Sequence, residues 1–574
     1  MIVRDSRAGK LPPDTGLELN GGEVDRNPGS NTLIGLGPNS LPDSETRGSC
    51  TRSNEKGRRS TQASGSRDHM AGQQARADSS QGCCFELRVL TDEQLQTVHQ
   101  ATLDVLHSVG IRVESEEALE IFHGAGAGVE PRDDYSVVRF PPALIEDCIS
   151  SAPSRLVYHG RLPEDDYVAE PGKVGFTTFG ECVQIIDPVD RRVRSTTKDD
   201  LARITRICDR LEEIVVVERP VGSLDQFAPT QPLHNYEVMV SNTSKHIFLG
   251  FYSAENVKRI AQMAAACVGG VENFRRRPTI TAFSCPTSPL VLARMCCEVI
   301  IQCARLGIGV CPISMVLSGA TSPATLTGSL VVHNAEVLAA IALAQLAVRG
   351  TPCTYASCST IMDLRFGVPA TGAPEHGMIS AALTRLAHYY ELPCLVGGGL
   401  SDSKLPDCQA AYEFALSATV AALSGAHFVY GAGALESGLT FDYAKLIMDC
   451  EQIRRIQHLR RGMPISSDAL ALDVIKTVGP GGDYLIRQHT IDNMGTLSQA
   501  DLFDRRNRSM WMNKTGGKDL TERAYEKANH VLATHEPAPL PGGAAETMRR
   551  IITEYEAELK RKDGLAASTG NTLK

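Results

Sequence analysis

Eight short β-rich runs, each followed by a longer segment with helical periodicity, constrain the fold of this chain most. The runs lie at residues 174–180, 214–220, 246–251, 279–285, 308–314, 352–358, 393–398 and 427–433. Helical patterns between them cover residues 201–211, 257–268, 292–306, 335–348, 378–390 and 410–423. Continuous apolar runs that alternate with helices are typical of parallel strands covered by helices. The sequence therefore predicts an α/β fold, a (β/α)8 TIM barrel spanning residues 174–445.

The competing architecture is an open, doubly wound sheet. Such sheets often carry a G-x-G-x-x-G fingerprint between a strand and a helix. Gly397, Gly398 and Gly399 follow a predicted strand, but the later spaced glycine is missing. The number and spacing of the strands favour the closed barrel.

The remaining segments are assigned from composition and helix signals. Residues 1–82 are dominated by Gly, Ser, Arg, Asn and Asp, and we expect them to be disordered. An N-terminal helical cap region is expected at 83–173, where Thr91 and Gln94 form a predicted capping box. A helical extension that packs on the barrel is expected at 446–560, followed by a flexible tail at 561–574.

Composition excludes several classes of partner. The formal net charge is −9 and no Lys/Arg block runs through the predicted folded region, which argues against nucleic acid and anionic membranes. No run reaches the roughly 20 apolar residues of a membrane span, and the N-terminus lacks a secretory signal, so we expect a cytoplasmic chain. The 17 cysteines are scattered in apolar runs without C-x-x-C spacing, so no metal site is expected. A small-molecule site is the default expectation.

Polar residues cluster in the loops that follow the predicted strands, where barrel enzymes place their functional groups. Asp363 and Arg365 either orient a charged substrate or pair with each other. Glu375 and His376 either form an acid/base couple or cap the helix near Met378.

A second polar cluster follows the seventh predicted strand. We expect Asp407 to act as an N-cap for the helix that carries Gln409. Lys404 has no apolar flank that would lower its pKa, so it is interpreted as an ion-pair donor. The sequence has no Ser-His-Asp order and no G-x-S-x-G elbow, which argues against a hydrolase.

Several loop motifs carry a family resemblance. They are Cys285-Pro286-x-Ser288-Pro289-Leu290, Gly319-Ala320-Thr321-x-Pro323-x-Thr325, Asn334-Ala335-Glu336-Val337-Leu338, Gly372-x-Pro374-Glu375, Ser401-Asp402-Ser403-Lys404-x-Pro406-Asp407-x-Gln409 and His489-Thr490. In these motifs, from about residue 88 to 555, the chain resembles the trimethylamine methyltransferase family. The resemblance implies a TIM barrel that transfers a methyl group from a methylated amine to cobalt. The corrinoid that holds this cobalt is carried by a separate partner protein, so no cofactor is expected on this chain.

The resemblance also implies a substrate class. In the founding branch of the family, pyrrolysine in the loop after the seventh strand presents trimethylamine to cobalt. This chain has no such residue, and the corresponding region is Gly398 to Ser401. We therefore expect a substrate of the pyrrolysine-free branch, a quaternary amine such as glycine betaine. The alternatives are another methylated amine, a corrinoid-independent lyase or demethylase, and a non-catalytic binding homologue.

A quaternary nitrogen leaves as a neutral amine, so the protein needs to hold a cation rather than supply an acid. Aromatic faces attract such a cation by about 0.5–2 kcal/mol each. The predicted substrate-binding residues are Phe179, Phe251, Tyr252, Tyr355, Asp363, Arg365, Phe366, Glu375, His376 and Tyr430, of which Arg365 and His376 would bind a carboxylate. The predicted site loop comprises Gly398, Gly399, Ser401, Asp402, Lys404, Asp407 and Gln409. Phe283 and Tyr355 lie within predicted strands, where filling of the barrel is the favoured role, and no catalytic residue is assigned.

The sequence leaves the quaternary structure open. Apolar helices on the barrel exterior, such as residues 335–348, are covered either by the terminal regions or by another subunit. A homo-oligomer is one of these two expectations.

Overall fold

A computed structural model describes residues 85–570, with side chains up to residue 562, so the predicted disorder at 1–82 lies outside the described residues. Eight parallel strands form the barrel, in the order β6-β19-β18-β15-β13-β11-β10-β9. They are β6 (Gly175–Thr178), β9 (Val217–Glu218), β10 (Ile247–Gly250), β11 (Ile280–Ser284), β13 (Gly309–Ser314), β15 (Tyr355–Ser357), β18 (Cys394–Gly397) and β19 (Phe428–Ala432). Val215 N donates to Phe176 O at 3.0 Å and joins the segment before β9 to β6. The predicted TIM barrel is confirmed, with all eight strands inside the predicted runs.

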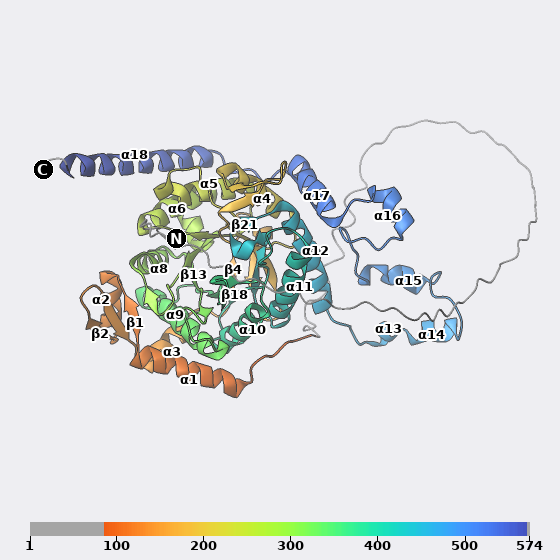
Figure 1. Ribbon diagram of the computed structural model, residues 1–574, viewed down its shortest axis with the longest axis horizontal. Helices are drawn as coiled ribbons and strands as arrows, with labels where there is room; N and C mark the ends of the chain where they lie inside the picture. Colours follow the sequence, from red (N-terminus) through yellow and green to blue (C-terminus); the bar gives the residue numbers. More distant parts are fainter. Residues whose placement is uncertain (1–84, 571–574) are drawn as a thin grey trace, which may run out of the picture. The chain divides into compact units, whose positions relative to one another are not determined.

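Helices surround the strands (Figure 1). They are α4 (Lys198–Arg210), α5 (Gln231–Asn242), α6 (Ala254–Cys267) with the short α7 (Val271–Arg276), α8 (Arg294–Leu306), α9 (Leu326–Ala347), α10 (Pro374–Tyr389), α11 (Cys408–Leu423) and α12 (Tyr443–Arg460). The sequence reading missed α5, because its buried face carries polar residues such as His234 and Asn235. In length and composition α9 could cross a membrane, but 78% of its most apolar window is buried inside the protein. It is a core helix.

The N-terminal region is a mixture of helices and strands, not the helical cap predicted from sequence. It contains α1 (Asp92–Ser108), α2 (Glu116–Gly124), α3 (Pro142–Ser151), β1 (Ile111–Val113), β2 (Gly128–Pro131), β3 (Ser136–Arg139), β4 (Leu156–Tyr158), the single-turn helix η1 (Pro163–Asp165) and β5 (Tyr167–Ala169). The predicted capping box at Thr91 and Gln94 is present. The strands escaped prediction because runs of three or four residues give almost no periodic signal.

This region covers the N-terminal end of the barrel and its side. Tyr158 reaches between Phe248 and Phe428 of the barrel, with ring centroids 5.6 and 4.8 Å away. α1 and α3 both contact α9. The opposite end, where the strands point, is therefore left to the loops of the barrel itself.

Those loops contain two small sheets that the sequence did not predict. One combines β7 (Gln184–Ile186), β8 (Val193–Ser195), β20 (Ala434–Leu435) and β21 (Thr440–Phe441), with the turn η3 (Glu436–Gly438). The other combines β14 (Leu317–Ser318), β16 (Thr360–Asp363) and β17 (Val368–Ala370). A further short strand, β12 (Val291–Leu292), pairs with β1. These strands stiffen the C-terminal face of the barrel.

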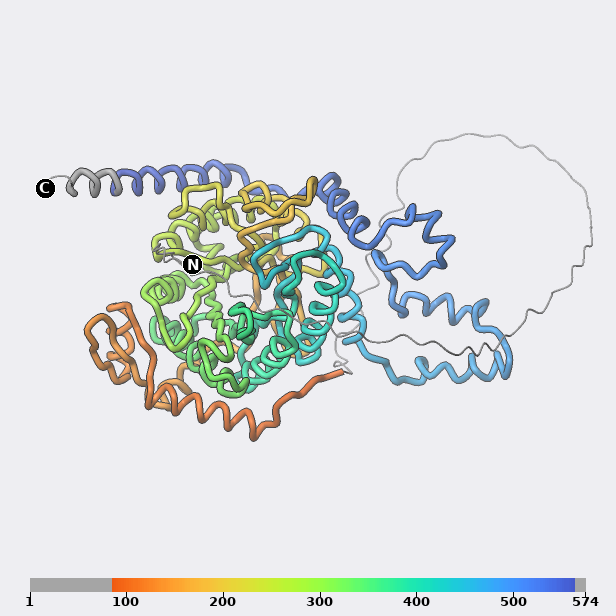
Figure 2. The backbone as a smooth tube through the Cα atoms, viewed as in Figure 1, coloured from red at the N-terminus to blue at the C-terminus, as the bar shows by residue number. Residues whose placement is uncertain are grey.

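The predicted C-terminal extension falls into three parts. α12 packs against α11 and against α17 (Leu520–Thr534), and α18 (Ala544–Gly570) lies along α5 and α6, continuing into the segment predicted as a tail. Between α12 and α17 lie α13 (Ser467–Leu470), α14 (Leu472–Val478), α15 (Gln488–Asn493), η4 (Met494–Thr496) and α16 (Arg508–Thr515), which are drawn in blue in Figure 2. None of these four α-helices, α13 to α16, buries a side chain. The η2 turn (Ala228–Thr230) precedes α5.

Candidate functional site

A cavity of about 470 Å³ opens at the C-terminal ends of the barrel strands. Its lining comes from the ends of β6, β9, β10, β11, β13 and β15, from the loops that follow them and from the first turns of α8. The volume is in the range of small-ligand sites. This is the end of a TIM barrel at which functional loops converge.

Four aromatic side chains line this cavity. Phe179, Phe251, Tyr252 and Phe283 all line it, and the first three were expected at strand ends. Phe283 was interpreted as barrel filling, yet it is only partly buried and faces the cavity. Tyr430 is fully buried with its ring centroid 5.7 Å from that of Phe179, so it backs the wall from within the barrel.

Tyr355 does not belong to this aromatic group. Its hydroxyl donates to Asn334 Oδ1 at 2.9 Å, and its ring lies 5.5 Å from that of His333, so it faces α9 on the outside of the barrel. Successive residues of a strand point to opposite faces, and the sequence did not reveal which face Tyr355 takes. The prediction that Tyr355 binds substrate is replaced by a packing role between strand and helix.

A buried carboxyl group, missed in the sequence, also lines the cavity. Glu218 at the end of β9 is 1% exposed, and its Oε1 accepts a hydrogen bond from Gly180 N at 3.0 Å. Its Oε2 is buried and has no hydrogen-bond partner in the described protein. Burial raises the pKa of Glu218 well above its ordinary value, and a nearby cation would favour its carboxylate form.

A buried guanidinium stands beside it. Arg219 is 6% exposed, lines the same cavity and pairs with Glu181 through Nη2. Its Nε and Nη1 are buried without a partner among the described residues. Buried unpaired donors are costly, so they mark places where a ligand can supply acceptors. The signal in the sequence was the charged Glu218-Arg219 pair at the end of an apolar run.

Two cysteines also line the cavity, and Cys285 is exposed. Cys358 is buried, and burial raises its pKa to about 12. It remains a thiol at neutral pH, whereas nucleophilic or metal-binding cysteines act as thiolates. Both cysteines contribute soft apolar surface.

Asp363, Arg365 and Phe366 lie away from the cavity. They form the tip of the β16–β17 hairpin, where Arg365 Nη2 lies 2.6 Å from Asp363 Oδ2 and the arginine side chain is 80% exposed. Phe366 is 74% exposed. Of the two alternatives predicted from the sequence, Asp363 and Arg365 follow the one in which they pair with each other. Phe366 does not line the cavity.

Glu375 and His376 are adjacent in sequence, but their side chains have different environments in the structure. α10 begins at Pro374 with Glu375 in its first turn and no side-chain cap. His376 is fully buried, its Nδ1 lies 3.0 Å from Ser359 O, and its Nε2 has no partner in the described protein. Burial lowers the pKa of His376, so the ring is neutral at pH 7 and provides no positive charge for a carboxylate.

The predicted site loop is held in place by hydrogen bonds within the protein. Asp402 accepts hydrogen bonds from Thr371 and Ser437, and Asp407 accepts from Ala410 N at 3.0 Å as the N-cap of α11. The same loop is tied internally by bonds from Ser401 and Gln409 to Glu413 and from Lys404 to the Asp402 carbonyl. None of Ser401, Asp402, Lys404, Asp407 and Gln409 lines the cavity.

Gly398 and Gly399 allow close packing of the protein itself. A Cβ at Gly399 would lie 2.7 Å from Gly431 C, and one at Gly398 would lie 2.7 Å from Val429 Cγ1. The space that these glycines leave is already filled by β19. In the structure, these two members of the predicted site loop allow a tight contact between neighbouring segments.

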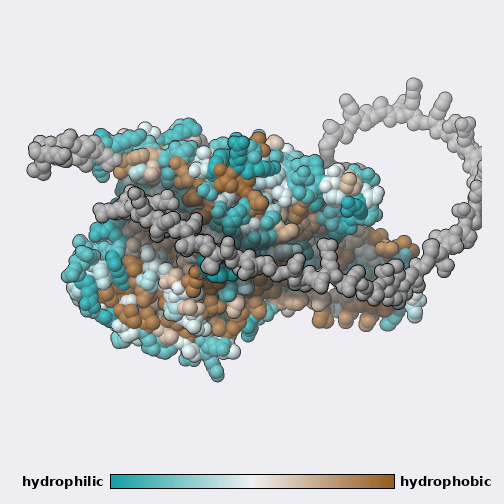
Figure 3. Space-filling model, viewed as in Figure 1, coloured by the Kyte–Doolittle hydropathy of each residue, from teal (hydrophilic) through white to brown (hydrophobic). Residues whose placement is uncertain are grey.

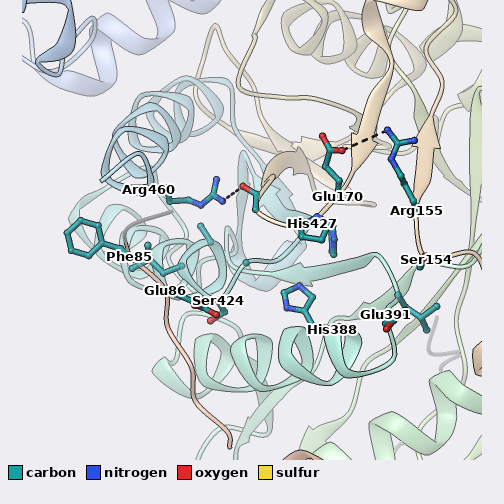
Figure 4. Close-up of a pocket in the computed structure, with 16 residues that line it drawn as sticks. Phe85, Glu86, Ser154, Arg155, Glu170, His388, Glu391, Ser424, His427 and Arg460 are labelled. Atoms are coloured by element: carbon teal, nitrogen blue, oxygen red, sulfur yellow. Dashed lines mark hydrogen bonds and ion pairs between the residues drawn. The ribbon is translucent and has the colours of Figure 1, made fainter. Parts of the chain in front are cut away.

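A larger cavity of about 780 Å³ opens at the other end of the barrel (Figure 4). Beside it, ligand atoms of His388, Cys394 and His427 lie within 4.8 Å of one another, the arrangement most suggestive of a metal site among the described residues. Cys394 N already donates to His427 Nδ1 at 3.2 Å, and its Sγ lies 3.5 Å from the same nitrogen. These bonds account for the cluster without an ion.

The chain was compared with known proteins. A family model described as trimethylamine methyltransferase (MTTB) matches residues 54–560. Trimethylamine methyltransferase MttB of Desulfitobacterium hafniense (strain DSM 10664 / DCB-2) is 47% identical over 474 residues, which cover 83% of this chain and 95% of the relative. The MttB of Methanosarcina thermophila is 38% identical over 81% of this chain and 96% of its own length.

A third relative has a different named substrate. The glycine betaine methyltransferase of Desulfitobacterium hafniense (strain Y51) is 32% identical over 485 residues, which cover 82% of this chain and 98% of the relative. The matches extend across the barrel and both of its flanking regions. The chain is a methyltransferase that belongs to the trimethylamine methyltransferase family.

Proposed function

We propose that this chain transfers a methyl group from a quaternary amine of the betaine type to the cobalt(I) of a separate corrinoid protein. The observation that carries the proposal is the cavity at the strand ends, where an aromatic wall meets the buried Glu218 and Arg219. Family membership supports the reaction class, and the cavity supports the choice of substrate.

The cation would lie against the aromatic wall and Glu218. A trimethylammonium group has no N–H to donate, so it is held by ring faces and by an opposite charge. Phe179, Phe251, Tyr252 and Phe283 supply four rings around one small space. Approach of the cation favours the carboxylate form of Glu218, whose Oε2 has no other partner in the described protein.

Arg219 would bind the opposite end of the substrate. Its Nε and Nη1, which have no partner in the described protein, can each donate a hydrogen bond to a substrate oxygen. A substrate with a quaternary nitrogen and a carboxylate a few bonds apart therefore fits both buried charges. Neither charge would be left unpaired when such a zwitterion is bound.

The transfer itself requires positioning more than acid or base catalysis. Cobalt(I) supplies the electron pair for the new bond to carbon, while the C–N bond breaks and leaves its electrons on nitrogen as a neutral tertiary amine. Because that amine needs no proton to leave, the absence of a protonated histidine from the cavity is compatible with the reaction. The cage would aim one methyl group at the open face of the barrel.

Trimethylamine is the second candidate. It is favoured by the 47% identity to the MttB of Desulfitobacterium hafniense, against 32% to the glycine betaine enzyme. Trimethylammonium has no carboxylate, so Arg219 would have no role in its binding. The two candidates therefore make opposite predictions for this residue.

The test mixes the full chain with reduced cob(I)alamin and one amine at a time. Glycine betaine is expected to give methylcobalamin and dimethylglycine, measured by absorbance and by chromatography. Choline and trimethylamine are the comparison substrates. Formation of methylcobalamin from trimethylamine alone, or from none of the three with both free cobalamin and a corrinoid protein as acceptor, would refute the proposal.

A further inference from the structure

A buried acidic residue on α9 connects two of the segments that form the strand-end cavity. Teal, hydrophilic residues cover much of the face shown in Figure 3, whereas Glu336 is only 1% exposed, between Ala335 and Val337. Its motif, residues 334–338, is one of those that carry the family resemblance. Glu336 does not line the cavity. An ionisable group is costly to bury, so the partners of Glu336 indicate what it does.

The carboxyl group of Glu336 accepts three hydrogen bonds. Leu290 N donates to Oε1 at 2.8 Å, and the Ser288 hydroxyl donates to Oε2 at 2.7 Å. The Ser314 hydroxyl donates to the same Oε2. Ser288 and Leu290 belong to the loop after β11, whereas Ser314 is the last residue of β13, the neighbouring strand of the barrel. One side chain of α9 therefore ties the ends of two adjacent strands together.

The loop that Glu336 holds has an unfavourable backbone conformation. Leu290 has a φ of 60°, in the left-handed region that residues other than glycine seldom adopt. The bond to Glu336 and a bond from Arg112 N to Leu290 O at 3.0 Å fix both backbone polar groups of this residue. Strained positions persist only where the surrounding structure enforces them, and they are frequent at functional sites.

Both of the tied segments contribute to the wall of the cavity. Pro286 in the loop and Met315, which follows β13, line it. The loop then leads into α8, whose first turn supplies Met295 to the same lining. The aromatic rings after β6 and β10 lie on strands that the three bonds do not reach. Glu336 is therefore placed to set one part of the wall while leaving the cation-binding rings where they are.

We infer that Glu336 is a positioning residue for methyl transfer, because it holds the loop after β11 against the end of β13 and so sets the wall that aims the substrate's methyl group. The inference rests on the proposed function, in which the strand-end cavity binds the cation. A displacement of about 1 Å between reacting groups can slow a reaction about 100-fold. Loss of Glu336 should therefore lower turnover while the rings and Glu218 still bind the cation.

The test separates binding from turnover in the full chain. Calorimetry with tetramethylammonium gives the affinity and the fraction of sites that bind, and methyl transfer from saturating glycine betaine to cob(I)alamin gives the rate per binding site. Glu336→Ala removes all three bonds and should lower this rate about 30-fold, with the affinity changed less than about threefold. Glu336→Gln keeps an acceptor for Leu290 N and offers two N–H donors to the serine hydroxyls, so it should recover to within about threefold of the wild-type rate.

Asn334→Ala is the matched control. Asn334 is buried on the same helix two residues away, but it bonds to Thr102, Tyr355 and Tyr390, none of which lines the cavity. This variant loses buried hydrogen bonds as Glu336→Ala does, yet its rate per binding site should stay within about twofold of wild type.

A second variant keeps the test decisive if Glu336→Ala does not fold. Ser288→Ala removes one of the three bonds at a half-buried hydroxyl and should lower the rate about threefold with unchanged affinity. Equal losses of affinity and rate, a normal rate in Glu336→Ala and Ser288→Ala, or a Glu336→Gln variant as slow as Glu336→Ala would overturn the inference. Failure of the wild-type chain to bind tetramethylammonium would refute the cation site itself, a separate failure that removes the basis of the inference.

Discussion

The cavities at the two ends of the barrel differ in volume and in the hydrogen bonding of the residues around them, and the larger one is not the better candidate for a ligand site. The cavity at the N-terminal end is larger, about 780 Å³ against about 470 Å³ at the strand ends. Deep in its wall, however, His427 Nδ1 is paired with Cys394 N. At the strand ends, Glu218 Oε2 and Arg219 Nε and Nη1 are buried and unpaired within the described protein. Buried polar atoms without a hydrogen-bond partner, which cost stability, are the stronger sign of a ligand site.

The largest effect should come from Glu218. Glu218→Gln keeps an acceptor for the Gly180 N–H but removes the negative charge, so methyl transfer from glycine betaine should fall about 100-fold, equivalent to ~3 kcal/mol. The fold should be retained, because glutamine has nearly the same size and shape and still accepts the hydrogen bond from Gly180 N. Transfer rates to cob(I)alamin measure the loss, and near-normal rates would mean that the strand-end cavity is not the cation site.

Arg219 tests the carboxylate end. Arg219→Gln should weaken glycine betaine binding about 30-fold, or ~2 kcal/mol, while tetramethylammonium, which has no carboxylate, should bind within about twofold of wild type. Calorimetry gives both affinities. Arg365→Gln, which changes the exposed arginine of the hairpin, is the matched control and should affect neither ligand. Equal losses for both ligands would remove the carboxylate role.

Proton release should accompany binding of a fixed cation. The pKa of Glu218 is raised in the free protein, so below that pKa the group must lose its proton to pair with tetramethylammonium. Affinity should therefore increase as the pH rises, by about tenfold per pH unit at most, and should level off above the pKa. Titrations in buffers of different ionisation enthalpy detect the proton. In Glu218→Gln the pH dependence should vanish, and its persistence would assign the proton to another group.

The aromatic wall should give a smaller effect. Phe251→Leu keeps apolar bulk but removes a ring face, so affinity for tetramethylammonium should fall about fivefold, or ~1 kcal/mol. Phe366→Leu removes the exposed ring of the hairpin and should leave the affinity unchanged. If the two variants behave alike, the rings of the cavity do not hold the cation.

The smallest effect is expected at the other end of the barrel. His388→Gln alters a side chain that lines the larger cavity, and methyl transfer should stay within about twofold of wild type. A loss comparable to that of Glu218→Gln would instead favour the cavity at the N-terminal end of the barrel as the functional site.

The sequence identified some of the residues that line the cavity, but not all of them. Phe179, Phe251 and Tyr252 were identified because they follow predicted strands, and the fold then brought them to one cavity. Tyr355 was expected at the substrate site but lies outside the cavity. The sequence could not reveal this, because the face of the barrel wall to which a strand residue points depends on the neighbouring helices. Arg365 was expected to bind a substrate carboxylate, but its loop forms a β-hairpin that carries it away from the cavity. The strands of this hairpin are too short to give a periodic signal in the sequence.

By itself, the sequence determined the alternation of eight strands and their helices, because each apolar period is a local property of the chain. It also placed the N-caps at Thr91 and Asp407, since a capping side chain bonds to a backbone only three residues away. Only the tertiary structure decided that Glu218 and Arg219 share one cavity with aromatic rings from the ends of three other strands. Burial and the pairing of charges depend on contacts between residues far apart in sequence, and these exist only once the barrel has closed.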